Sequence, residues 1–301
     1  MQKPFRSGKV KDVYIFGEEL EFHYTDKISV FDKIIPTLVP DKGETLCRTS
    51  AHWFERIQDL GIGSHFIGLK APNVMRVRKV DIISDYSKID KNTKNYLIPL
   101  EFICRHYVAG SMHDRIRKGK VDVKDLGFPG GYTPKYGEKF PKPYFEVTTK
   151  LEKYDRSVNM DEALKISGMT EAEMDDVKDA IIRIDELIAK EIASKGLIHV
   201  DGKKEFAFDK NRKVMVIDSF GTADEDRFWE KASWEKGEFV ELSKESVRQY
   251  YRKTGYLDKL EKARSDGKKE PDIPPLPADV VRSTRDLYIQ IFERLTGKPF
   301  H

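Results

Sequence analysis

Residues 97–115 read LIPLEFICRHYVAGSMHDR and predict a buried strand that runs into a helix. The first part is apolar, as in strands that are covered on both faces. Glu101 and Arg105 interrupt this run, and Gly110 and Ser111 follow where a helical pattern begins. Since an isolated charge is costly to bury, we expect the two charged side chains either to pair with each other or to line a binding cleft.

The composition is that of a folded protein with a moderate excess of basic residues. Of 301 residues, 39% are hydrophobic and 35% are charged, which provides a core and excludes a disordered chain. The basic excess raises the alternative of a nucleic-acid-binding module. However, the net charge of +3 is spread along the sequence, which disfavours that class and suits a pocket for anionic small molecules.

Cysteine usage and hydropathy indicate the compartment. Cys47 and Cys104 form no CxxC pattern, and no apolar run has the length of a signal-sequence core or of a membrane span. We therefore expect a cytoplasmic protein that works without a membrane or a nucleic acid as its partner.

Hydrophobic periodicity predicts a β-rich first third followed by mixed helices and strands. A hairpin is expected over 10–25 around Gly17, and a helix over 170–195 begins with a capping box of Thr170 and Glu173. The other predicted elements are helices over 45–60 and 278–296, strands over 64–69, 74–83, 97–108, 197–201, 204–208 and 214–220, and a long loop over 119–145. This order favours an α+β fold over a doubly wound sheet.

Two lysines at alternating positions stand at the start of the first hairpin. In the segment GKVKD, Lys9 and Lys11 would point to one side of a strand, where their ammonium groups can contact a polyphosphate. The segment is not a Walker A loop. The alternative is a pair of solvated lysines.

Carboxylates in two neighbouring strands predict a metal site. Asp201, Lys203 and Glu205 alternate and would share one face, and a facing strand brings Asp218 within the apolar run VMVIDSF. Since Mg²⁺ prefers oxygen ligands and shares them with phosphate, we expect Glu205 and Asp218 to hold it. The alternative is the polar solvent face of a hairpin.

Arg227 precedes two aromatic residues in the segment ADEDRFW, a setting that can hold a guanidinium rigidly for a phosphate. The alternative is a local ion pair with the acidic residues before it.

Lys150 and Asp155, after the long loop, form a further candidate set. The histidines lack the spacing of a zinc site.

Taken together, these stretches resemble the SAICAR synthetase family over almost the whole chain. The matching segments are GKVKDVY, TDKISVFD, VPDKGETL, LIPLEFICRHYVAGS, FEVTTKLEKYD, VDGKKEF and VIDSFGTADEDRFW. The most specific is LIPLEFICRHYVAGS, which keeps the family's spacing of Pro, Glu, Arg and Gly-Ser. The resemblance implies a two-lobed α+β fold: a mostly antiparallel β lobe over 1–100 that binds ATP, a mixed α/β lobe over 101–301, and a cleft between them.

The resemblance also implies a reaction of purine biosynthesis. ATP, carboxyaminoimidazole ribotide (CAIR) and L-aspartate would give SAICAR, ADP and phosphate, with Mg²⁺ on the nucleotide. A small-molecule kinase of a related fold is the alternative, and the oligomeric state stays open.

The resemblance and the residue patterns together assign roles within the site. Lys203, Asp218 and Arg105 would be catalytic. ATP would be bound by Lys9, Lys11, Glu101 and Lys203, and the metal by Glu205 and Asp218. Ribotide and aspartate would be bound by Arg105, Ser111, Lys150, Asp155, Asp224 and Arg227.

The chain departs from the usual family pattern near its predicted phosphate site. Glu225 and Asp226 stand where the family usually has two serines, Lys204 occupies a usually apolar position, and Tyr154 replaces a usual histidine. Carboxylates accept hydrogen bonds and cannot donate them to a phosphate. We therefore expect Glu225 and Asp226 to turn outward while backbone N–H groups serve the phosphate.

Overall fold

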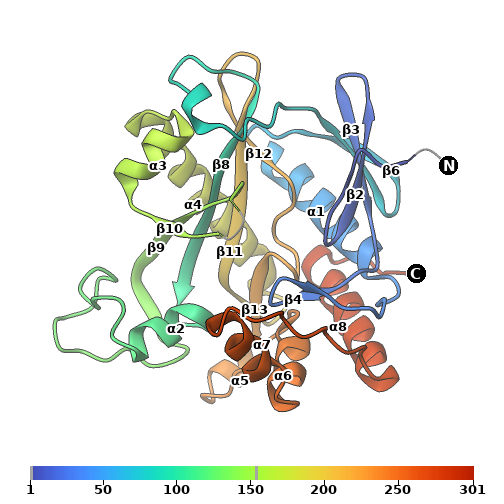
Figure 1. Ribbon diagram of the computed structural model, residues 1–301, viewed down its shortest axis with the longest axis vertical. Coiled ribbons are helices and arrows are strands. Elements are labelled where there is room, and N and C mark those ends of the chain that lie inside the picture. The colour runs from blue at the N-terminus through green and yellow to red at the C-terminus, as the bar shows by residue number, and fades with distance from the viewer. Residues whose placement is uncertain (1–2, 153–154) are drawn as a thin grey trace.

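The computed structural model describes residues 3–152 and 155–301 and contains two antiparallel sheets (Figure 1). The first sheet has the order β1-β2-β3-β7-β6. Its strands are β1 (Arg6–Ser7), β2 (Lys11–Phe16), β3 (Glu19–Tyr24), β6 (Phe66–Ala71) and β7 (Val74–Arg78). The predicted hairpin is confirmed as β2 and β3, and Gly17 takes the positive φ of 62° that its tight turn requires.

The second sheet has the order β10-β9-β8-β11-β12, and β13 pairs with β11. Its strands are β8 (Tyr96–Tyr107), β9 (Lys139–Thr149), β10 (Ser157–Val158), β11 (Leu197–Phe208), β12 (Val214–Ile217) and β13 (Asp226–Glu230). The long strands β8 and β11 lie side by side at its centre, with Arg105 opposite Asp201 and Glu101 opposite Glu205. A separate ribbon joins β4 (Ser29–Val30) to β5 (Lys33–Ile34).

Helices cover these sheets and extend the molecule below them (Figure 1). They are α1 (Lys42–Gln58), α2 (Gly110–Arg117), α3 (Met160–Ser167), α4 (Glu171–Ala193), α5 (Lys231–Trp234), α6 (Glu245–Lys253), α7 (Tyr256–Ser265) and α8 (Ala278–Thr296), with a 3-10 turn η1 (Tyr86–Lys88). The predicted capping box of Thr170 and Glu173 is present at the start of α4. The α+β fold is thus confirmed, and no helix within the described ranges is long and apolar enough to cross a membrane.

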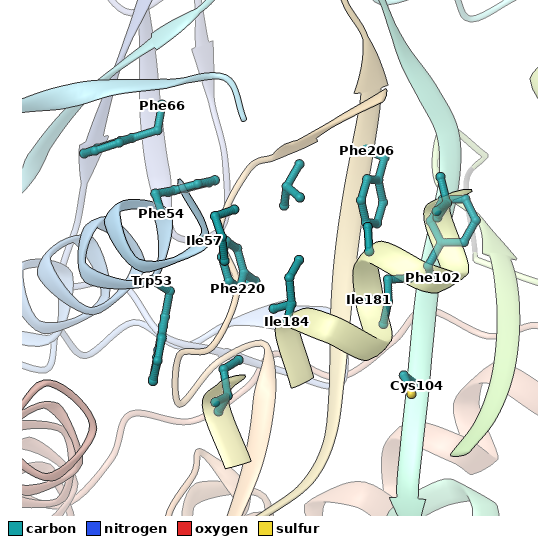
Figure 2. Close-up of a cluster of buried hydrophobic side chains, with 14 of the residues drawn as sticks. Trp53, Phe54, Ile57, Phe66, Phe102, Cys104, Ile181, Ile184, Phe206 and Phe220 are labelled. Atoms are coloured by element: carbon teal, nitrogen blue, oxygen red, sulfur yellow. The ribbon is translucent and has the colours of Figure 1, made fainter. Parts of the chain in front are cut away.

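The core joins the two halves of the chain (Figure 2). Phe54 of α1 stacks on Phe66 with ring centres 5.3 Å apart and meets Phe220 edge-on at 5.1 Å. Nε1 of Trp53 donates a 3.0 Å hydrogen bond to the carbonyl oxygen of Gly221. Helix α1 therefore holds the loop after β12, from which several predicted site residues come.

Several expectations about secondary structure are wrong in part. The strands predicted over 74–83 and 214–220 end early, at Arg78 and at Ile217. The predicted loop over 119–145 ends early, because β9 begins at Lys139 and pairs with β8. Pro141 and Pro143 lie within β9, and prolines are rare inside strands, so the sequence did not predict this strand. The two strands expected over 197–201 and 204–208 are one continuous strand, β11, in which Gly202 lies opposite Asp226. The division into lobes at residue 100 stays a prediction.

Candidate active site

Two adjoining cavities lie beside the centre of the second sheet. The first has a volume of about 1130 Å³ and the second about 740 Å³. Both are lined by Phe31, Lys203, Asp224, Glu225, Lys244 and Arg248. Lys203 therefore faces a junction at which ligands of the two cavities can meet.

The first cavity lies between the two sheets and combines an apolar wall with lysines. The wall includes Val13, Ile15, Leu20, Phe22 and Ile217. Lys9 and Lys11 line it as well, as the alternation predicted that both would face one side. Lys9 is half exposed and lies 2.6 Å from Asp32, so it stands at the edge of the cavity.

Lys11 is the more buried of the two lysines. Its Nζ lies 4.4 Å from the ring centre of Phe22 and contacts the carboxylate of Asp218. Burial is the largest influence and lowers the pKa of Lys11 to about 8, against the raising effect of Glu205. Its charge is therefore sensitive to pH near neutrality.

Glu101, Lys150, Lys203 and Glu205 form an ion cluster at the junction. Nζ of Lys203 lies 2.9 Å from Glu101 and 3.3 Å from Glu205, and Nζ of Lys150 lies 2.5 Å from Glu205. Burial raises the pKa of Glu101. For Glu205 burial acts in the same direction, but Lys150 and Lys203 outweigh it and lower its pKa to about 2. Lys203 remains protonated, because its acidic neighbours raise its pKa despite its burial.

The position of Asp218 beside this cavity depends on a backbone turn that the alternation pattern did not predict. Glu205 lies opposite Ile217, not Asp218, and β12 ends at Ile217. Asp218 has a φ of 66°, a left-handed conformation that costs a non-glycine residue of the order of 1 kcal/mol. The backbone turns there, and Asp218 lines the first cavity with Glu205 although it does not face it across the strands.

Guanidinium groups dominate the second cavity. Arg105 is held by Glu146 through Nε at 2.7 Å and by Asp201 through Nη1 at 3.0 Å. Arg227 lies 2.5 Å from the same Asp201 oxygen and 3.4 Å from Glu241. Both arginines line the cavity. Carboxylates from two strands, β9 and β11, and from the loop that holds Glu241 fix their orientation. Ser111, at the start of α2, lines the cavity beside them.

The alternative of a Glu101–Arg105 pair is contradicted by these partners. The two residues lie four positions apart on β8, but Glu101 pairs with lysines and Arg105 with Glu146 and Asp201. The register of β9 beside β8 brings Glu146 to Arg105. The sequence did not indicate this contact, because the predicted loop covered residues 139–145 of β9 and hid the pairing of this strand with β8.

The expectation that Glu225 and Asp226 turn outward is wrong. Glu225 faces the junction, with its carboxylate 3.2 Å from Nζ of Lys203. Asp226 is buried and bonds to His199 at 2.7 Å. Each carboxylate thus has a partner inside the protein, a lysine or a histidine, that compensates for the loss of hydration.

The remaining predicted residues lie near the cavities. Asp224 lines both, but its carboxylate accepts bonds from Lys42 at 2.9 Å and Tyr288 at 2.5 Å. Burial would raise its pKa, and Lys244 and Lys42 lower it instead. Asp155 lines the first cavity. The departure at Tyr154 lies outside the described residues.

Sequence reasoning missed two cations at the junction. Lys244 and Arg248 line both cavities, and Arg252 lines the second. The sequence pattern could have predicted them, because these three residues lie four apart in KESVRQYYR and a helix would place them on one face.

Comparisons with known proteins identify the family of this chain. The SAICAR synthetase family matches residues 4–263. A phosphoribosylaminoimidazole-succinocarboxamide synthase of Thermoplasma acidophilum is 53% identical, over 98% of this chain and 99% of that protein. A SAICAR-synthase from Saccharomyces cerevisiae, solved in complex with SAICAR, has the same fold with a TM-score of 0.73 at 24% identity, covering 99% of this chain and 96% of the other.

A second solved structure is a type-2 SAICAR synthetase in complex with ADP. It matches 98% of this chain and 99% of its own with a TM-score of 0.68 at 24% identity, which again reflects the shared fold. Family assignment rests instead on the family match and on the sequence identity of the Thermoplasma relative. This chain belongs to the SAICAR synthetase family.

Proposed function

We propose that this chain carries out its reaction at Lys203, where the two cavities meet. The activity is that of a phosphoribosylaminoimidazole-succinocarboxamide synthase, an ATP-dependent C–N ligase of purine biosynthesis, given a relative at 53% identity over nearly the full chain. The observation that carries the site proposal is the adjoining pair of cavities with Lys203, held by Glu101 and Glu205, at their junction. Such a reaction must bring a polyphosphate and a carboxylate together.

ATP is assigned to the first cavity. Its apolar wall suits a purine base, while Lys9, Lys11 and Lys203 supply positive charge for the phosphates. Glu101 holds Lys203 at 2.9 Å and thereby keeps its ammonium group at the junction. The terminal phosphate of the nucleotide would then face the second cavity.

Mg²⁺ fits the carboxylates at this junction. Oε2 of Glu205 is buried and has no hydrogen-bond partner among the residues described by the structure. A buried carboxylate oxygen without a partner is costly, and oxygen is the ligand type that Mg²⁺ prefers. Glu205 and Asp218 are the residues that would hold the ion, which when bound would neutralise charge on the phosphates of ATP.

CAIR and aspartate are assigned to the second cavity and the junction. Arg105, Arg227 and Ser111 would bind the anionic groups of the ribotide, because planar guanidinium groups match phosphate and carboxylate at two points. Lys150, in the ion cluster at the junction, and Asp155, which lines the first cavity, would contact the reacting carboxylate and the aspartate amine from the side of the first cavity. Asp224, whose oxygens are taken by Lys42 and Tyr288, is assigned a positioning role.

The reaction then needs two group transfers. A carboxylate oxygen of CAIR attacks the γ-phosphorus of ATP, the bond to ADP breaks, and an acyl phosphate forms. The amine of aspartate attacks the acyl carbon, the bond to phosphate breaks, and the amine releases a proton. Lys203, fixed and protonated, stabilises the negative charge that develops during the first transfer.

Omission of each substrate in turn tests this proposal. ADP release should require ATP, CAIR and aspartate together, and SAICAR should form in equal amount. Strong ATP turnover with CAIR alone and no SAICAR would favour the kinase alternative and contradict the ligase.

We also propose that the enzyme works in the cytoplasm. Its two cysteines, Cys47 and Cys104, are both free and buried, as expected in a reducing compartment. Detection of the chain in the cytosolic fraction of its own cells would test this assignment.

A further inference from the structure

A second group of charged residues lies behind the site, in the protein interior. Lys204 and Asp185 are completely buried, and their Nζ and Oδ1 atoms lie 2.5 Å apart. Nζ of Lys204 also lies 3.6 Å from Oδ2 of Asp226, and His199 bonds to that same oxygen at 2.7 Å. His106 bonds to the other oxygen of Asp185 at 2.9 Å.

Lys204 supplies the positive charge that this group requires. Asp185, His199 and Asp226 have their ligating atoms within 4.8 Å of one another, a spacing that can hold a cation. The ammonium group of Lys204 lies in contact with Asp185 and near Asp226, so the chain provides its own cation. Burial opposes the charge of Lys204, yet the two carboxylates raise its pKa above the ordinary value.

Asp226 connects this interior group to the second cavity. Its Oδ1 accepts a 2.8 Å hydrogen bond from the backbone N–H of Gly221, and its own N–H donates to the carbonyl oxygen of Thr222 at 2.8 Å. The conformation of the turn from 221 to 226 is therefore stabilised by hydrogen bonds to the buried Asp226. Gly202 lies directly opposite, where a Cβ would stand 2.2 Å from Oδ2 of Asp226, so the carboxylate fills that space.

Arg227 follows Asp226 on the same strand and points to the opposite face. Successive side chains of a strand alternate, so the buried direction of Asp226 requires Arg227 to point into the cavity. There it meets Asp201, and its Nη2 lies close beside Gly110. A shift of Asp226 would move this guanidinium.

We propose that Lys204 is a positioning residue that, by balancing Asp185 and Asp226 in the interior, holds Arg227 in the ribotide cavity. Without the ammonium group two buried carboxylates repel each other across His199, and the 221–226 turn shifts. This inference rests on the proposed function only in assigning the second cavity to the ribotide.

The test compares Lys204→Met with the wild-type enzyme. Met keeps the length of the side chain and removes its charge. We expect a Tm lower by about 10 °C and a kcat/KM for CAIR lower by about 10- to 100-fold at a temperature where the variant is folded, with the KM for ATP within about twofold. The double variant Lys204→Met/Asp185→Asn, which restores charge balance, should recover both the Tm and the kcat/KM.

A remote cation provides the matched control. Arg212 bonds to Glu173 and to three backbone carbonyl oxygens, and it lines neither cavity. Arg212→Met should lower the Tm and leave the kcat/KM for CAIR unchanged. If Lys204→Met behaves in the same way, its role is structural only and the inference is wrong.

A double-mutant cycle separates this inference from the site assignment. If Lys204 acts through Arg227, Lys204→Met should have little further effect on the kcat/KM for CAIR in an Arg227→Ala background. Additive effects would overturn the inference, whereas an Arg227→Ala enzyme with normal use of CAIR would overturn the ribotide site itself.

A milder substitution keeps the test decisive if Lys204→Met does not fold. Asp226→Asn preserves the shape of the side chain and leaves Lys204 paired with Asp185. If the amide oxygen keeps the bond from Gly221, an NH2 group replaces the oxygen that faces Lys204 and His199, so the attraction that holds residue 226 is lost. It should selectively raise the KM for CAIR, and a normal KM would contradict the inference.

Discussion

The two cavities differ in how they are built. The first has an apolar wall and a compact cluster of lysines and carboxylates, whereas the second is mostly polar and presents guanidinium groups held by carboxylates. This difference corresponds to the chemistry of the ligands: ATP carries a large apolar base, and the ribotide offers anionic groups at several points. Substitutions that affect one ligand and not the other are therefore the way to test the division.

The largest effect is expected from Asp218→Asn in the first cavity. Loss of this carboxylate removes a proposed metal ligand, and kcat should fall by about 10²- to 10³-fold, the cost of losing one electrostatic stabiliser of a transition state. Activity measured across a Mg²⁺ titration checks this, with Asp175→Asn on the exposed face of α4 as the control. Near wild-type turnover at low Mg²⁺ would show that Asp218 is not a ligand.

The next largest effect is expected from Arg227→Ala in the second cavity. Hydrogen bonds to a charged group contribute about 1.5–3 kcal/mol each, so the KM for CAIR should rise by about 10- to 150-fold. The KM for ATP should change little, because Arg227 does not line the first cavity. Arg117→Ala, an exposed arginine of α2, is the control, and equal effects on the two substrates would argue against separate cavities.

A smaller effect is expected from Arg105→Lys. Lysine keeps the charge but cannot contact Glu146 and Asp201 with a planar fork, so CAIR should bind about tenfold more weakly. Steady-state kinetics with CAIR and ATP varied separately measure the effect. If both KM values rise together, Arg105 supports the sheet and does not bind the ribotide.

The smallest effect is a pH dependence in the first cavity. The pKa of Lys11 is lowered to about 8, so its positive charge is lost as the pH rises through that value. The kcat/KM for ATP, which reports the free enzyme, should fall by about threefold between pH 7.5 and pH 8.5. Lys11→Arg should remove this decline, and a wild-type profile that is flat over this range would contradict the role of Lys11.

The sequence predicted the parts of the site that depend on local periodicity. Alternation along β11 placed Lys203 and Glu205 beside the first cavity, because successive residues of a strand point to opposite faces. Lys11 at the start of β2 lines this cavity as predicted, and Lys9 does so as well although it precedes the strand. The capping box of α4 and the final helix, α8, were also predicted, since helix caps and apolar spacing are local properties.

The partners of these residues were decided only by the tertiary structure. Arg105 depends on Glu146 of a strand that prolines concealed, and Asp218 reaches the cavity through a left-handed turn that no alternation pattern contains. Asp226 points into the interior, where it lies beside His199 and Lys204, whereas the local sequence suggested solvent. A charge is placed by the neighbours that balance it, and here those neighbours come from strands, turns and a helix far apart in the chain.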